Sequence, residues 1–137
     1  MVQQTITTTD TSRLELGRRM FEQALGSSAA DFAASLDAVA PGFADMILET
    51  EFGNAYQRPG LDLKTRELVI VATCAVIGTA GFDAVKMHIP AALRAGATRT
   101  EVVEVLFQIA FSAGLPTAIG ALQVAKSVFD ALDQQAA

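Results

Sequence analysis

The sequence predicts an all-α fold, in the form of a single compact domain of about six to seven helices. Long segments repeat apolar residues every three or four positions, which is the spacing of one buried helix face. Residues that favour helix starts and helix ends stand between these segments. Runs of alternating valine and isoleucine bounded by hairpin turns are missing, so strands have little support.

The chain has 137 residues, which is in the usual range of one domain. We expect the helical domain over residues 12–134 and a disordered tail over residues 1–11, which are rich in threonine and glutamine. This tail has neither a basic region nor an apolar stretch, so it is not expected to be a secretory signal.

Three helices are expected in the first part of the chain. The first covers about residues 12–25 and ends at Gly26, which is a favoured residue just after a helix. A short helix follows over about residues 31–39. Another opens at Pro41, because proline fits the first turn of a helix, and carries several apolar residues. Residues 57–60, with the sequence Gln-Arg-Pro-Gly, are then expected to form a loop that interrupts the helical pattern.

The most apolar helix is expected over residues 63–77. Asp62 is a good N-cap for it, and after its first turn the helix is apolar on nearly every side. Such a helix must be covered all round. We expect the core to cover one face and a neighbouring subunit to cover another.

A turn over residues 78–81 leads into a helix over about residues 82–95, which Gly96 closes. Pro90 lies inside this helix and has no N–H to donate to the carbonyl of Lys86, so a bend can form there.

The last two helices are marked by strong start signals. Thr98 and Glu101 have the spacing of a capping box, and the helix that they start is expected to end at Gly114. Pro116 starts the final helix, which is expected to run to about Leu132.

The composition points to an assembled, water-soluble protein. Hydrophobic residues make up 51% and charged residues 18%, against about 25% charged residues in an average domain. We expect subunit contacts to hide the surplus apolar surface, and therefore a homo-oligomer. The longest apolar run, residues 68–80, is interrupted and shorter than the roughly 20 residues of a membrane span.

Charge and cysteine content exclude further classes. The net charge is −5 and the basic residues are scattered, so nucleic acid is not an expected partner. The lone cysteine, Cys74, lies in the most apolar segment, as a buried structural thiol does. This pattern is typical of a reducing compartment, and we expect a cytoplasmic protein.

Several stretches together resemble the carboxymuconolactone decarboxylase family. They cover about residues 41 to 130, in the order that the family has them. The stretches are LKTREL at 63–68, MHI at 87–89, AGAT at 95–98, EVVEVL at 101–106, Gln108 and GLP at 114–116.

This resemblance implies an all-helical fold and homo-oligomers, commonly trimers or hexamers. It also implies the founding activity of the family, the removal of carbon dioxide from 4-carboxymuconolactone without a cofactor. A second branch, the alkylhydroperoxidase D type, carries Cys-x-x-Cys followed by three residues and a histidine. Those two positions are Gly81 and Ala84 here, so the redox dithiol is absent.

The chain also departs from the family pattern around the histidine. The segment between Gly78 and His88 is a residue or two longer than is typical, and Ala84 replaces a common glutamate or glutamine. Ser112 and Ala113 replace a tyrosine and a small or cysteine residue. These changes alter the surroundings of His88, and hence bear on the substrate.

Decarboxylation of such a lactone sends an electron pair through the ring double bond to the carbonyl, giving a dienolate. The site must hold a carboxylate, stabilise the new oxyanion and return a proton to carbon. Arg66 is the candidate for the carboxylate, because its planar fork matches two oxygens. The alternative is an exposed Arg66 paired with Asp62.

His88 is the candidate acid-base residue, because it is the only histidine and matches the position of the family's histidine. Glu67 resembles the glutamate that the family places upstream of it. The alternatives are a structural His88 and a solvated Glu67 in the first helical turn. Gln108 is a candidate oxyanion donor or a tie between helices, and Lys86 is a candidate substrate contact or a solvated lysine.

No metal or cofactor is expected. One histidine without a cysteine cluster or paired carboxylates offers no recognisable metal-ligand set, and a glycine-rich phosphate loop is missing. The leading hypothesis is a cofactor-independent lyase for a small anionic lactone. The alternatives are a cofactor-free isomerase, cyclase or hydratase of an enolisable metabolite, and a non-catalytic oligomeric binding protein.

Overall fold

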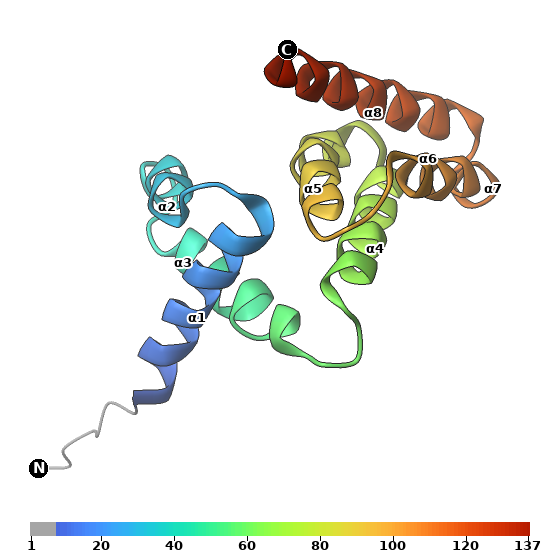
Figure 1. Cartoon of the computed structure of the whole chain (residues 1–137). Coiled ribbons are helices and arrows are strands. Elements are labelled where there is room, and N and C mark those ends of the chain that lie inside the picture. Colours follow the sequence, from blue (N-terminus) through green and yellow to red (C-terminus); the bar gives the residue numbers. More distant parts are fainter. Residues whose placement is uncertain (1–7) are drawn as a thin grey trace, which may run out of the picture. The chain divides into compact units, whose positions relative to one another are not determined.

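The computed structural model describes residues 8–137, with side chains described from Arg13 onward. All regular elements in this range are helical, which confirms the all-α prediction (Figure 1). The chain forms two compact units, one up to Gly60 and one from Leu61 to Ala137. The tail expected over residues 1–11 falls mainly on residues 1–7, which lie outside the described residues.

The first unit is built from three α-helices and two short helical turns. These are α1 (Thr8–Leu25), α2 (Ala29–Asp37), α3 (Phe43–Ile47), the π-helical turn η1 (Leu48–Phe52) and the 3₁₀ turn η2 (Ala55–Gln57). Several bounds differ from expectation, and the helix expected over residues 31–39 is α2 at Ala29–Asp37. The first helix starts before residue 12, and α3 starts at Phe43 and not at Pro41, because Gly42 adopts a left-handed φ of 84° that precedes the helix.

An aromatic cluster and a close backbone contact hold this unit together. The Phe52 ring centroid lies 5.1 Å from that of Phe21 and 4.6 Å from that of Tyr56. A Cβ on Gly17 would lie 1.9 Å from the Leu48 carbonyl oxygen. Glycine is therefore needed at this point for α1 to pack directly against η1.

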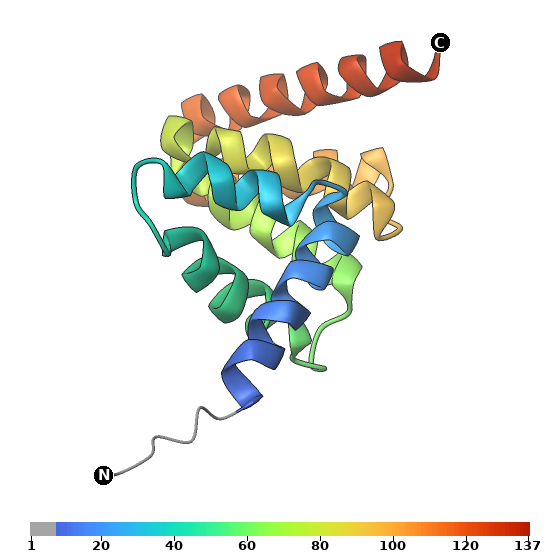
Figure 2. The same cartoon turned by 90° about the vertical axis from the view of Figure 1, so that its left-hand side faces the viewer.

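The second unit contains every residue proposed for the site. Its elements are α4 (Leu63–Val76), the 3₁₀ turn η3 (Gly78–Gly81), α5 (Phe82–Arg94), α6 (Arg99–Gln108), α7 (Ala110–Ala113) and α8 (Leu115–Ala136). Helix α5 packs against both α4 and α8, as Figures 1 and 2 show. Fully buried Val71, Val85, Ile89, Val102 and Leu106 form the centre of the core.

The two strongest local predictions in this unit are confirmed. The Asp62 carboxylate caps α4 by accepting a hydrogen bond from the Thr65 N–H at 2.7 Å. Thr98 and Glu101 form the capping box of α6. Both signals depend on residues three positions apart, so local geometry alone settles them.

Other expectations need correction. Helix α5 contains Pro90, as expected, and ends at Arg94, one residue before the expected end. The helix expected to continue from Thr98 to Gly114 ends at Gln108, and α7 follows as a separate turn before Gly114. The last helix extends to Ala136, beyond the expected end near Leu132.

Within the second unit, the apolar helix α4 is covered on one face only. Val71 and Ala75 are fully buried, whereas Val69, Val76 and Ile77 are 46%, 46% and 66% exposed. The expected cover from a neighbouring subunit therefore stays a prediction. Within residues 8–137, no helix combines the length and apolar character that a membrane crossing requires.

Candidate active site

Helices α4 and α5 bring Glu67 and His88 together in the core of the second unit. Glu67 Oε2 lies 2.6 Å from His88 Nδ1. Glu67 is fully buried and His88 is 7% exposed, and they are the buried polar or ionisable side chains among those that the structure describes. Burying two ionisable groups is costly even when they pair, so a role in chemistry is a strong reason to keep them.

The register of the two helices explains why this pair can form. Helices α4 and α5 are antiparallel neighbours, so moving forward along α4 from Glu67 corresponds to moving back along α5 from His88. Seven residues on, Cys74 faces Gly81, where an added Cβ would lie 1.9 Å from the Cys74 carbonyl oxygen. Seven residues are about two helical turns, so one face of each helix makes both contacts.

The same contact shows why a dithiol does not fit this chain. Gly81 is buried directly against the α4 backbone, and Ala84 is half-buried one turn further along α5. A cysteine at position 81 would put its Cβ into the Cys74 carbonyl group. The helices would have to separate to admit it, because a backbone atom cannot move aside as a flexible side chain can.

The pairing also assigns the two ring nitrogens of His88. When Glu67 is ionised, its carboxylate only accepts hydrogen bonds, and the His88 Nδ1–H then donates to Glu67 Oε2. This leaves Nε2 as the nitrogen that takes or gives a proton. Since Glu67 has no exposed surface, the imidazole is the member of the pair that a substrate can touch. The arrangement is that of a general acid-base residue oriented by a carboxylate.

The burial of Glu67 excludes the alternative that it is a solvated acid of the first helical turn. Arg66, its neighbour on α4, is half-buried. Lys86 lies two residues before His88 and therefore on another side of α5. Its half-exposed ammonium is 3.8 Å from Asp83 Oδ1.

Gln108 is not brought to the pair through the core. It is exposed at the last position of α6, two residues after fully buried Leu106, and so lies on the side of α6 away from its buried face. The substrate contacts expected of Arg66, Lys86 and Gln108 thus stay predictions.

One residue that positions α4 was missed by reasoning from the sequence. Lys64 Nζ donates to Glu101 Oε1 at 2.9 Å, and Glu101 Oε2 accepts from the Thr98 N–H at 2.8 Å. The N–H of Thr98, followed by the Lys64 ammonium, lowers the pKa of Glu101. Glu101 thereby caps α6 and ties it to the first turn of α4. The capping box was the available signal for Glu101, but no local spacing pointed to Lys64.

Comparison with known proteins gives a consistent set of matches. Residues 41–127 match the model of the carboxymuconolactone decarboxylase family. The chain is 33% identical over 87 residues to the 4-carboxymuconolactone decarboxylase of Acinetobacter baylyi, covering 64% of this chain and 63% of that protein.

Two further relatives are similar over comparable or longer stretches. An uncharacterized 15.0 kDa protein from the nqo9-nqo10 intergenic region of Paracoccus denitrificans is 40% identical over 92 residues, covering 67% of this chain and 68% of that protein. The nitrosuccinic acid decarboxylase npaB of Metarhizium robertsii is 30% identical over 135 residues, covering 91% of this chain and 92% of that protein.

Proposed function

Because the chain belongs to the carboxymuconolactone decarboxylase family, we propose that it is a cofactor-independent carboxy-lyase in which Glu67 and His88 perform the acid-base chemistry. The observation that carries this proposal is the buried 2.6 Å contact between Glu67 Oε2 and His88 Nδ1. It joins the two residues that the family resemblance had marked, from two helices and 21 positions apart.

The proposed reaction breaks the bond between the substrate carbon and its carboxylate. The electron pair of that bond moves into an adjacent electron-accepting group, and carbon dioxide leaves. His88, which enters this step with a proton on each ring nitrogen, gives the Nε2 proton to carbon. Its Nδ1–H stays hydrogen-bonded to Glu67, which fixes the ring. Water restores the proton to His88 after product release, so the cycle consumes one proton and needs no oxidant or reductant.

The names of two relatives support a class of substrate. One is a decarboxylase of 4-carboxymuconolactone and the other of nitrosuccinic acid. Each of these compounds pairs a carboxylate with a group that accepts electrons, a conjugated lactone carbonyl or a nitro group. We propose a small anionic substrate of this class, with a 4-carboxymuconolactone-like lactone as the first candidate. Arg66 is the proposed holder of a carboxylate, and Gln108 and Lys86 are secondary candidates for polar contacts.

We also propose that the protein works as a homo-oligomer, with a trimer or hexamer as the expected form, in the cytoplasm. The supporting feature is a set of exposed apolar residues, called the apolar stripe, that recur at every fourth position of the sequence from α6 through α7 into α8. Its members are Val103, Phe107, Phe111, Leu115 and Ile119, and they are 36%, 58%, 78%, 68% and 55% exposed. Residues 105–125 contain no charged side chain, so nothing in this segment opposes burial against a second copy.

The test is carbon dioxide release from 4-carboxymuconolactone and from nitrosuccinic acid by the purified, assembled protein. We expect release from at least one of them above the uncatalysed rate. Turnover of an enolisable compound without carbon dioxide release would instead indicate an isomerase, cyclase or hydratase. Absence of turnover with both compounds and with simple enolisable acids would indicate a binding protein, and would overturn the proposal.

A further inference from the structure

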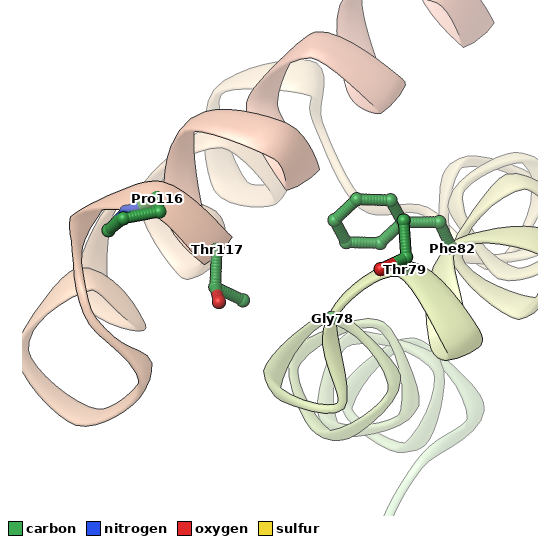
Figure 3. A pocket seen from close by; sticks show the side chains of 5 residues that line it. All are labelled: Gly78, Thr79, Phe82, Pro116 and Thr117. Atoms are coloured by element: carbon green, nitrogen blue, oxygen red, sulfur yellow. The ribbon is translucent and has the colours of Figure 1, made fainter.

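A recess of about 270 Å³ lies in the second unit, away from the Glu67–His88 pair. The turn η3 and the start of α5 form one wall, with Thr79 and Phe82, and the start of α8 forms the other, with Pro116 and Thr117 (Figure 3). Gly78 completes the lining. All five residues belong to the second unit, so the recess is formed within it.

The residues that line the recess are apolar or carry a hydroxyl group. The lining contains an aromatic ring, a proline ring and two threonine hydroxyl groups on opposite walls, and it contains no charged side chain (Figure 3). A threonine hydroxyl both donates and accepts hydrogen bonds. The recess is therefore matched to an uncharged molecule with an apolar body and an oxygen function, because no side chain that lines it carries a charge to pair with an ionic group.

The aromatic wall is held rigidly. A Cβ on Gly120 of α8 would lie 2.9 Å from Cε2 and Cζ of Phe82, so the ring rests directly on the α8 backbone. Pro116 has a fixed ring on the facing wall. Because both apolar surfaces are set before a ligand arrives, little ordering is needed on binding.

The recess is separate from the catalytic pair. Phe82 and His88 lie on the same helix, but six residues separate them, which is about 9 Å along the axis. Phe82 packs against α8, whereas His88 faces Glu67 on α4. Neither His88 nor Glu67 is among the residues that line the recess.

We propose that this recess is a second ligand site, which binds a small uncharged ring compound carrying a hydroxyl or carbonyl group. The volume of 270 Å³ corresponds to about nine water molecules, which is ample room for a single six-membered ring with one or two substituents. A ligand of this size in an open recess binds with a dissociation constant on the order of millimolar.

Phenol is a suitable probe, because it has one ring and one hydroxyl group and is uncharged at neutral pH. The measurement is a titration of the assembled, isotope-labelled protein with phenol, followed by the amide resonances of Thr79, Phe82 and Thr117. We expect saturable shifts at these residues. Benzoate, the charged counterpart, is expected to shift them much less at the same concentration.

Variants locate the interaction. Thr117→Val removes a hydroxyl at nearly constant volume and is expected to raise the dissociation constant for phenol about threefold to tenfold. Thr117→Ser restores a hydroxyl and is expected to restore binding. Thr100→Val is the matched control, since Thr100 is an exposed threonine in the first turn of α6 and does not line the recess. The spectra also report whether each variant is folded.

The same titration keeps this proposal distinct from the proposed decarboxylase function. Phenol binding is expected to persist in His88→Gln, and a decarboxylase assay has no bearing on it. Three results would overturn the second site: phenol shifts that centre on residues outside the lining, equal affinity for Thr117→Val and the parent, or an equal response to benzoate.

Discussion

The buried position of Glu67 is the structural feature that bears most directly on function. Its carboxylate has no exposed surface, and it lies beside an imidazole that is itself nearly buried. A buried carboxylate paired with a histidine orients the ring and supports it when it takes a proton. Two aliphatic residues in place of Glu67 and His88 would fill the same volume without burying ionisable groups, so a role in chemistry is a physical reason for the pair.

Glu67→Gln should therefore impair catalysis more than folding. The amide keeps the shape of the side chain but removes the charge and can present either a donor or an acceptor to Nδ1, so His88 loses its fixed proton. We expect turnover to fall by about a hundredfold to ten-thousandfold, with a melting temperature close to that of the parent. Steady-state kinetics and thermal unfolding of the same preparation measure both. Parental turnover would show that Glu67 has only a packing role.

Gly81 tests the close approach of α4 and α5. Gly81→Ala places a methyl group 1.9 Å from the Cys74 carbonyl oxygen. We expect it to destabilise the fold by about 1–3 kcal/mol, the usual cost of overpacking. Denaturant unfolding measures this change. Gly60→Ala is the matched control, because a Cβ there has no atom within 4 Å, and it should unfold at the parental midpoint. Equal midpoints for both variants would contradict the close packing of Gly81 on α4.

At the scale of elements, two carboxylates fasten α6 to its neighbours. Asp133 of α8 accepts two hydrogen bonds from the Arg99 guanidinium, at 2.6 and 3.2 Å, and Glu101 accepts from Lys64. Arg99 lowers the pKa of Asp133 below its ordinary value of 3.8. The Thr98 N–H, then Lys64, lower the pKa of Glu101 below its ordinary value of 4.5.

These directions predict acid sensitivity. A carboxyl whose folded pKa is lowered stabilises the fold above its unfolded pKa, and this contribution is lost as pH falls through the folded pKa. We expect the unfolding midpoint in urea to be steady above about pH 5 and to decline from there downward. Asp133→Asn should flatten part of the decline. Both pairs are exposed, so added salt should reduce the effect. A midpoint that rises on acidification would contradict the assignment.

The elements also show what sequence could and could not predict. Helix caps such as Asp62 and Thr98 were predictable because each bonds a group three residues away. The contact between Lys64 and Glu101 joins residues 37 positions apart. The helix is interrupted between α6 and α7, although no proline or glycine marks this position in the sequence. Such features depend on how helices pack, which no short-range spacing reveals.

The candidate site also has features that the sequence predicted and features that it could not. Glu67 and His88 could be proposed from the family resemblance, but their contact and their burial depend on the antiparallel register of α4 and α5. Burial also excludes a solvated Glu67, while its catalytic role stays a prediction. For Arg66, Lys86 and Gln108 the proposed roles depend on a bound substrate, and so they stay predictions.

At the scale of the whole molecule, the exposed apolar stripe on α6, α7 and α8 is the feature that a lone subunit leaves unexplained. Phe111 is its most exposed member at 78%. Exposed aromatic residues in an uncharged segment are typical of subunit interfaces. The stripe therefore links the apolar composition of the chain to its proposed assembly.

Phe111→Asp should weaken that assembly. A charge at the centre of an apolar interface must be desolvated when the copies meet, so we expect dissociation at protein concentrations at which the parent stays assembled. Light scattering over a dilution series measures this. Val39→Asp is the control, since Val39 is 88% exposed but lies in the first unit and outside the stripe. A parent that is monomeric throughout the series would contradict the prediction.

The central claim is that His88 moves the proton in a decarboxylation, and turnover by His88→Gln tests it most directly. The comparison uses 4-carboxymuconolactone or another substrate that the parent decarboxylates, with parent and variant matched in oligomeric state and melting temperature. General acid-base assistance is worth about a hundredfold to ten-thousandfold, so we predict that the variant releases carbon dioxide at least about a hundredfold more slowly. Release at the parental rate by a folded, fully assembled variant would contradict the account and make His88 a structural residue.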